Sequence, residues 1–91
     1  MTARKKENQK RKIGEIIRGY RNNLTDIPKG RQNFINNRAE VYFEGEDWIS
    51  EKMLANYEKG SNIPSLENIK RLSIALEVDL QQFVMEILKN L

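Results

Sequence analysis

The stretch WISEKMLANYEKGSNIPS, residues 48–65, predicts one short helix with both of its ends marked. Asp47 or Ser50 can accept hydrogen bonds from the first free amides of a helix, and Gly60 can take the left-handed conformation that closes one. Pro64 then separates this helix from the next. The apolar residues at helical spacing between these signals, which we expect to face the core, are Ile49, Met53, Leu54 and Tyr57. The stretch therefore predicts a helix of about ten residues.

The outer face of this predicted helix carries small and polar side chains. Lysine and asparagine match the guanine and adenine edges in the major groove of DNA, and glutamate can accept from cytosine. A small alanine at the centre lets such a helix approach the groove closely. The residues expected on this face are Glu51, Lys52, Ala55, Asn56 and Lys59. Any surface helix has a polar face, so this feature does not decide the function alone.

The composition restricts the class of protein. The chain has 91 residues, 38% hydrophobic and 32% charged, which suffices for one small domain with a modest core. It contains no cysteine and no histidine, which excludes disulfide scaffolds, thiolate nucleophiles, imidazole bases and most transition-metal sites. No glycine-rich phosphate loop and no nucleophile paired with a base is evident. We therefore expect no enzyme activity, no cofactor and no metal site.

Charge is distributed unevenly along the chain. The net charge is only +3, but residues 1–38 carry 11 basic and 3 acidic side chains, whereas residues 39–91 carry 5 basic and 10 acidic ones. Residues 1–12, MTARKKENQKRK, contribute six of the basic side chains without apolar periodicity. They predict a basic N-terminal arm, either flexible or a frayed extension of the next helix. Such an arm can contact DNA or can simply be solvated.

No segment of the chain predicts membrane insertion or export. The sequence lacks a run of about 18 apolar residues, the length of a membrane span, and its N-terminus lacks the apolar core of a signal peptide. We therefore expect a cytoplasmic protein without membrane contact.

Four further helices are predicted around the central one. Apolar periodicity predicts a helix from residue 13 to residue 22 or 23. Another helix begins at about Arg31. The sequence does not predict the residue at which it ends, because AEVYFEGED fits either a continuing helix or an extended piece. Ser65 and Asp79 can cap the last two helices. The inward residues expected after Ser65 are Leu66, Ile69, Leu72, Ala75 and Leu76. The fold class is therefore all-α.

The last predicted helix has a long apolar stripe. Its six apolar positions, from residue 80 to residue 91, exceed what a domain of this size needs to cover its core. The end of the stripe therefore predicts a homodimer interface. The residues expected to contribute are Phe83, Ile87, Leu88 and Leu91.

Three segments of the chain together resemble one known family. They are IGEIIRGYR at residues 13–21, ISEKMLANYEKG at residues 49–60 and NIPSLENIKRLSIALEVDLQQF at residues 62–83. In order and in hydrophobic phase they resemble the lambda-repressor-like, Cro-type helix-turn-helix family. The resemblance implies a five-helix domain over residues 13–91 that binds double-stranded DNA. Together with the apolar stripe of the last helix, it predicts a DNA-binding domain with a C-terminal dimerisation helix.

The resemblance also implies roles for individual residues. The helix opened by Ser50 would be the recognition helix, with its N-terminal half against base edges. By position, Glu51, Lys52 and Asn56 would contact bases, and Ser50 would hold a phosphate. Lys59, Ser61 and Asn62 would flank the DNA backbone. Arg21 and Glu58 occupy the places of an ion pair that ties the first helix to the recognition helix, and we assign them to the scaffold.

The chain departs from the family pattern before the recognition helix. Between Arg21 and Ser50 lie 28 residues, about a dozen more than the tight turn of this motif implies. The extra residues are divided between LTDIPKG and AEVYFEGEDW. The resemblance places Gln32 where the family has a phosphate-contacting or base-contacting glutamine. The acidic residues of the second piece, which phosphates repel and which we expect to point away from DNA, are Glu40, Glu44, Glu46 and Asp47.

These observations predict a sequence-specific DNA-binding transcriptional regulator, a repressor that recognises an inverted repeat as a homodimer. Two alternatives stay open. The first is a protein-interaction module, an anti-repressor or adaptor, that binds a protein partner through the insertion at residues 40–48 and the apolar stripe of the last helix. The second is the N-terminal DNA-binding part of a larger ligand-sensing regulator. Trp48 either stacks on a partner or, as we expect, packs into the core below the insertion.

Overall fold

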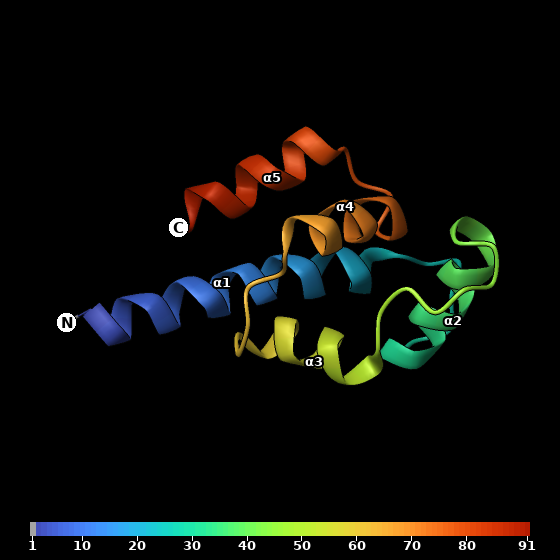
Figure 1. The fold of residues 1–91 in the computed structure, drawn as a ribbon, viewed down its shortest axis with the longest axis horizontal. Coiled ribbons are helices and arrows are strands. Elements are labelled where there is room, and N and C mark those ends of the chain that lie inside the picture. The colour runs from blue at the N-terminus through green and yellow to red at the C-terminus, as the bar shows by residue number, and fades with distance from the viewer. Residues whose placement is uncertain (1) are drawn as a thin grey trace.

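The computed structural model describes residues 2–91, with side chains from residue 8 onward, and these residues form five helices and no strand. The helices are α1 (Thr2–Asn23), α2 (Arg31–Tyr42), α3 (Glu51–Lys59), α4 (Leu66–Ala75) and α5 (Leu80–Lys89). In Figure 1, α1 runs along the molecule, α5 lies beside it on one side and α3 on the other. The predicted all-α class is confirmed. None of the described helices is long and apolar enough to cross a membrane.

One hydrophobic core connects all five helices. Each helix contributes at least one side chain that is almost completely shielded from solvent, and burial of one such side chain stabilises the fold by about 1.5–3 kcal/mol. The most deeply buried apolar residues are Ile13, Ile17, Phe34, Leu54, Leu72, Ala75, Phe83 and Ile87. The predicted periodicity of α1 and α3 therefore corresponds to real core faces, with the exceptions given below.

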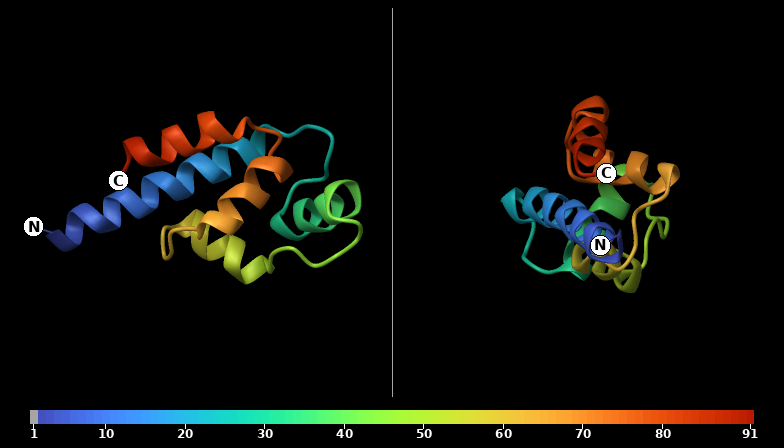
Figure 2. Two further views of the ribbon diagram at one scale, coloured as in Figure 1. Left: turned by 45° about the horizontal axis from the view of Figure 1, so that its top comes forward. Right: turned by 90° about the vertical axis from the view of Figure 1, so that its left-hand side faces the viewer.

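Helix α1 begins earlier than the apolar pattern predicts. The periodic residues start at Ile13, whereas the helix begins at Thr2. The predicted arm at residues 1–12 therefore overlaps the first half of α1, although Met1 and the side chains of residues 2–7 lie outside the described residues. Figure 2 shows this half of α1 extending beyond the other helices.

Helices α1 and α3 cross at two glycines. A Cβ atom at Gly14 would lie 2.4 Å from the carbonyl oxygen of Tyr57, and one at Gly60 would lie 2.7 Å from the Cα atom of Arg11. Real Cβ atoms do not approach this closely, so only glycine permits the two backbones to touch. The crossing fixes the end of α3 against the middle of α1.

Helix α5 is held on α1 by an aromatic contact and a hydrogen bond. The rings of Tyr20 and Phe83 meet edge to face, with their centroids 6.0 Å apart. The Tyr20 hydroxyl donates to the Glu86 carboxylate, 2.7 Å from Oε1. This bond raises the pKa of Tyr20, because the ionised phenol could no longer donate and would face a negative carboxylate.

The segment AEVYFEGED, whose sequence fits either a helix or an extended piece, continues α2 to Tyr42 and then turns. Glu44 and Gly45 both have positive φ, 56° and 77°, which reverses the chain. Trp48 lies in the core on the returning segment, where its ring stacks on Phe43 at 4.8 Å between centroids. Its Nε1 donates to the carbonyl oxygen of Ile35 at 3.1 Å. The prediction that Trp48 packs below the insertion is confirmed.

A buried arginine, which the sequence did not single out, joins α2 to α4. Arg38 Nε donates to the carbonyl oxygen of Ala75 at 2.8 Å, and Nη1 donates to Asp26 Oδ2 at 3.2 Å. Ala75 is the last residue of α4, so the guanidinium also neutralises the negative end of that helix dipole. Arg38 thereby fixes the link between α1 and α2 as well as the end of α4.

Two residues predicted to face the core are exposed instead. Met53 is 40% exposed and Leu66 is 84% exposed. Leu66 is the first residue of α4, where the chain has only begun to pack, and Ile69 is the first inward side chain. Met53 lies at the edge of the apolar face of α3, whereas Leu54 and Tyr57 of that face are buried as predicted.

Candidate nucleic-acid interface

The ends of α3 have the predicted capping geometry. Ser50 is in an extended conformation, and its Oγ accepts a hydrogen bond from the Met53 amide at 3.0 Å. Gly60 is left-handed, with φ 80° and ψ 23°, and its amide donates to the carbonyl oxygen of Tyr57 at 3.2 Å. Helix α3 thus spans residues 51–59, as the caps predict.

A buried carboxylate fixes the rotation of α3 about its own axis. Arg21 Nε, on α1, donates to Glu58 Oε2 at 2.6 Å, and Arg21 Nη2 donates to Oε1 at 2.9 Å. Arg31 Nε, on α2, donates to Oε1 at 3.0 Å. The ion pair of Arg21 and Glu58 that the resemblance implies is therefore present. Because Glu58 is held from two helices, the opposite side of α3 must face solvent.

The exposed side of α3 is basic and polar. Lys52 and Lys59 are exposed and Asn56 is half-buried between them. Asn56 follows Lys52 by four positions and precedes Lys59 by three, so the three side chains are neighbours along one strip of the helix surface. The structure thus brings together three of the residues predicted to contact DNA.

Ala55 differs from the prediction that it faces outward. Its side chain is 8% exposed, among the buried residues of α3. The reason is that α3 packs against α2 as well as α1, so its buried side is wider than one apolar stripe. A base could approach Ala55 only at the margin of the helix surface.

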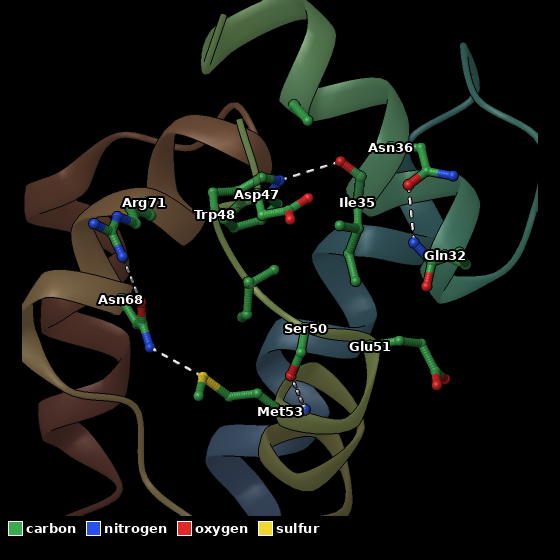
Figure 3. Close-up of a pocket in the computed structure, with 12 residues that line it drawn as sticks. Gln32, Ile35, Asn36, Asp47, Trp48, Ser50, Glu51, Met53, Asn68 and Arg71 are labelled. Carbon is green, nitrogen blue, oxygen red and sulfur yellow. Dashed lines mark hydrogen bonds between the residues drawn. The ribbon is translucent and has the colours of Figure 1, made fainter. Parts of the chain in front are cut away.

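A groove of about 540 Å³ adjoins the first turn of α3. Figure 3 shows α2 on one side of it, α4 on the other and the first turn of α3 between them. Polar side chains form its margins and the apolar core forms its floor. Its polar lining residues are Gln32, Asn36, Asp47, Ser50, Glu51, Asn68 and Arg71.

Gln32 is one of these lining residues, although it lies 18 positions before Ser50 in the sequence. Its Nε2 donates to Asn36 Oδ1 at 2.8 Å, one turn further along α2. The first turn of α2 and the first turn of α3 therefore open on the same groove. The structure brings the predicted Gln32 close to Ser50 and Glu51.

Glu51 lies at the other margin of α3, near a cation. Its Oε1 is 3.9 Å from Arg31 Nη1, and its side chain is about half exposed. Arg31 therefore partly offsets the negative charge that Glu51 would bring to a phosphate-rich surface. The sequence did not single out Arg31, because nothing in its local pattern shows that it contacts both Glu51 and Glu58.

The turn after α3 is ordered by backbone hydrogen bonds. The amide of Ser61 donates to the carbonyl oxygen of Asn56 at 2.8 Å, and the amide of Asn62 donates to the same oxygen at 3.4 Å. The side chains of Lys59, Ser61 and Asn62 are all exposed. These three predicted backbone-contacting residues are thus presented together beside α3.

The acidic residues occupy two different places. Figure 1 shows that the end of α2 and the following turn lie away from the start of α3. Glu44 and Glu46 in this turn line a second pocket, which Asp47 and Arg71 also line. On this side Tyr42 donates a hydrogen bond to Glu77, which raises the pKa of Tyr42. Asp47 differs from the expectation that the whole insertion points away, because it lines the groove beside Ser50.

The predicted dimerisation residues divide into two pairs. Phe83 and Ile87 are 0% and 2% exposed and belong to the core, so they cannot offer a side chain to a partner in this fold. Their assignment to an interface is wrong for a physical reason: α5 needs two turns of its apolar stripe to dock on α1 and α4. Leu88 and Leu91 are exposed.

Comparison with known proteins agrees with this geometry. The family model described as helix-turn-helix matches residues 45–83, from the turn after α2 to the first half of α5. No curated protein and no solved structure matches the chain significantly. The matched region contains the whole of α3, both of its caps and the following turn. Over residues 45–83, the chain is therefore similar to helix-turn-helix DNA-binding regulators of the lambda-repressor and Cro-like type.

Proposed function

We propose that the protein is a transcriptional repressor that binds an inverted DNA repeat as a homodimer and recognises each half-site with α3. The observation that carries the proposal is the exposed strip of Lys52, Asn56 and Lys59 on a helix whose opposite side is fixed by Glu58. A rigid helix with a polar outer face can enter the major groove without reorganising, so its contacts discriminate between bases.

The side chains of α3 would divide between bases and phosphates. The amide of Asn56 can form two hydrogen bonds with adenine, and the ammonium group of Lys52 can donate to guanine. Glu51 can accept from cytosine. The phosphate contacts would come from the groups around α3, which orient the helix without selecting a sequence. They are Gln32, Ser50, Lys59, Ser61 and Asn62.

Two copies would recognise the two halves of the repeat. A two-fold axis places two recognition helices about 34 Å apart, one turn of DNA, on the same face of the duplex. The exposed Leu88 and Leu91 support an interface at the end of α5. A dimer bound over a promoter would repress transcription by excluding the polymerase.

Binding to DNA tests the proposal most directly. A duplex selected from a random library and a random duplex are titrated with the protein, by fluorescence anisotropy, at two salt concentrations. We expect Asn56→Ala to cost about 1–3 kcal/mol on the selected duplex and to relax the preference at one base pair. Lys59→Ala should weaken both duplexes alike, because phosphates carry no sequence.

Two results would contradict the proposal. Equal losses on both duplexes for Asn56→Ala would show that α3 does not recognise bases. Binding that does not weaken at the higher salt concentration would show that phosphates contribute little, contrary to the counterion release expected of any protein held by lysine and arginine on DNA.

A protein partner is the second candidate function, and one surface favours it. Val41 and Tyr42 are exposed at the end of α2, next to Glu40 and close to Glu44 in the sequence. An exposed apolar pair with carboxylates nearby in the chain, and with Glu77 bound to Tyr42, is suited to a basic partner segment. If the protein bound no duplex at micromolar concentration, this surface would become the leading candidate.

A further inference from the structure

We propose that Met53 contacts the 5-methyl group of a thymine and thereby selects an A·T base pair in the half-site. This inference rests on the function proposed above and extends it to a residue that the apolar pattern assigned to the core. Thymine is the base that presents an apolar group in the major groove, so an apolar side chain on a recognition helix is suited to it.

Met53 is exposed on the part of α3 that adjoins the strip of polar residues. It is 40% exposed, whereas its neighbour Leu54 is completely buried. It precedes Asn56 by three residues, so the two side chains are neighbours on the helix surface. If Asn56 binds an adenine, Met53 would thus lie close to a neighbouring base pair in the same major groove.

The side chain of Met53 is anchored rather than free. The Nδ2 group of Asn68, on α4, lies 3.4 Å from the Met53 sulfur and donates to it. The same Nδ2 group donates to the Tyr57 hydroxyl at 2.8 Å, which holds the amide in place. Figure 3 shows Met53 reaching from α3 toward Asn68 across the groove. Because its sulfur is held, less conformational entropy is lost when a methyl group packs on it.

Met53 lies beside a groove that combines polar margins with an apolar floor. The groove beside it has polar margins, but its floor is formed by the core residues Ile35, Trp48 and Ile49. A thymine methyl group that packs on Met53 would leave water for an apolar environment. Burying one such group favours binding about three- to tenfold, enough to prefer thymine over a pyrimidine that lacks the methyl group.

Replacement of single thymines by deoxyuridine tests this contact. The replacement removes the 5-methyl group and keeps every hydrogen-bonding group of the base pair. Each thymine of a duplex selected with the wild-type protein is replaced in turn, and the Kd is measured by anisotropy. We expect the wild-type protein to lose about three- to tenfold at one thymine in each half-site.

The variant Met53→Gln tests whether the Met53 side chain causes the preference for thymine over uracil. Glutamine is similar in length and favours helix, but it presents a polar amide where methionine presents its sulfur and methyl group. We expect the Kd ratio between the uracil and thymine duplexes at that position to fall to about one. The matched control is Met85→Gln on α5, since Met85 is 53% exposed and lies outside α3. Circular dichroism and thermal melting check that both variants fold.

The possible failures are distinguishable. An unchanged ratio for Met53→Gln, with salt-dependent binding to the selected duplex retained, would overturn the role of Met53 and leave the proposed function standing. The same holds if no single uracil replacement weakens wild-type binding. If the wild-type protein binds no duplex, the proposed function and this inference both fall.

Discussion

The side chain of Glu58 joins three helices, α1, α2 and α3, at the predicted interface. Its carboxylate, almost completely buried, receives hydrogen bonds from Arg21 on α1 and Arg31 on α2. A buried ion pair adds little net stability compared with an apolar pair, but loss of one partner leaves an uncompensated charge. The residue thus contributes to the orientation of α3 more than to affinity for DNA.

Replacing Glu58 should therefore destabilise the fold strongly. Glu58→Gln keeps the shape of the side chain but removes the charge that two arginines share. We expect a loss of about 3 kcal/mol in the free energy of unfolding, measured by urea denaturation. The matched control is Glu67→Gln, whose ion pair with Arg71 at 2.5 Å is largely exposed; it should cost less than about 1 kcal/mol. Similar losses for the two variants would contradict this account of Glu58.

At the scale of the helices, α3 is placed by its crossing with α1. The backbones touch where Gly14 meets the carbonyl oxygens of Tyr57 and Glu58. These carbonyls belong to the last turn of α3, next to the exposed Lys59 and the turn that follows. A displacement of α1 from α3 would therefore move the predicted phosphate-contacting residues as well.

Two glycines of α1 offer a direct comparison. A Cβ atom at Gly14 would lie 2.4 Å from the Tyr57 carbonyl oxygen, whereas one at Gly19 would meet nothing within 4 Å. We expect Gly14→Ala to lower the free energy of unfolding by about 1–3 kcal/mol through overpacking. Gly19→Ala should raise it by about 0.5–1 kcal/mol, because alanine loses less backbone entropy in a helix. Chemical denaturation of the two variants measures both changes in the free energy of unfolding. Stabilisation by Gly14→Ala would show that α1 and α3 are packed less closely than described.

At the scale of the whole molecule, charge and apolar surface are separated. The exposed strip of α3 is basic, the end of α2 is acidic, and the end of α5 exposes Leu88 and Leu91. The first half of α1 and the C-terminus lie at the same end of the molecule in Figure 1, where Gln9 Nε2 donates to the carbonyl oxygen of Leu91 at 2.8 Å. The end of α5 is thus fixed on α1 while its outer side chains stay available for a second copy.

The proposed homodimer predicts a change of oligomeric state. Leu88→Lys places a charge in the proposed interface, and we expect it to raise the dimer dissociation constant at least tenfold, because a buried unpaired charge is costly. Sedimentation velocity over a range of concentrations measures this. The matched control is Leu66→Lys, since Leu66 is the more exposed leucine and lies on α4. Monomers at all concentrations for the wild-type protein would contradict the dimer.

Local signals in the chain predicted most of the fold. The caps at Ser50, Ser65 and Asp79 and the left-handed Gly60 act within a few residues, so their geometry follows from the local sequence. The end of α2 was not predictable in this way. AEVYFEGED carries both helical and extended patterns, and the burial of Trp48 against Phe43 and Ile35 decides between them.

By itself, the sequence determined that this protein is a small all-α domain, that a short helix starts after Asp47 or Ser50 and closes at Gly60, and which polar residues that helix carries. Only the tertiary structure decided how far the buried faces extend: in α3, Ala55 is buried and Met53 is exposed, and in α5, Phe83 and Ile87 belong to the core. The physical reason is that capping and helical periodicity are local, whereas burial depends on which helices pack against a given face.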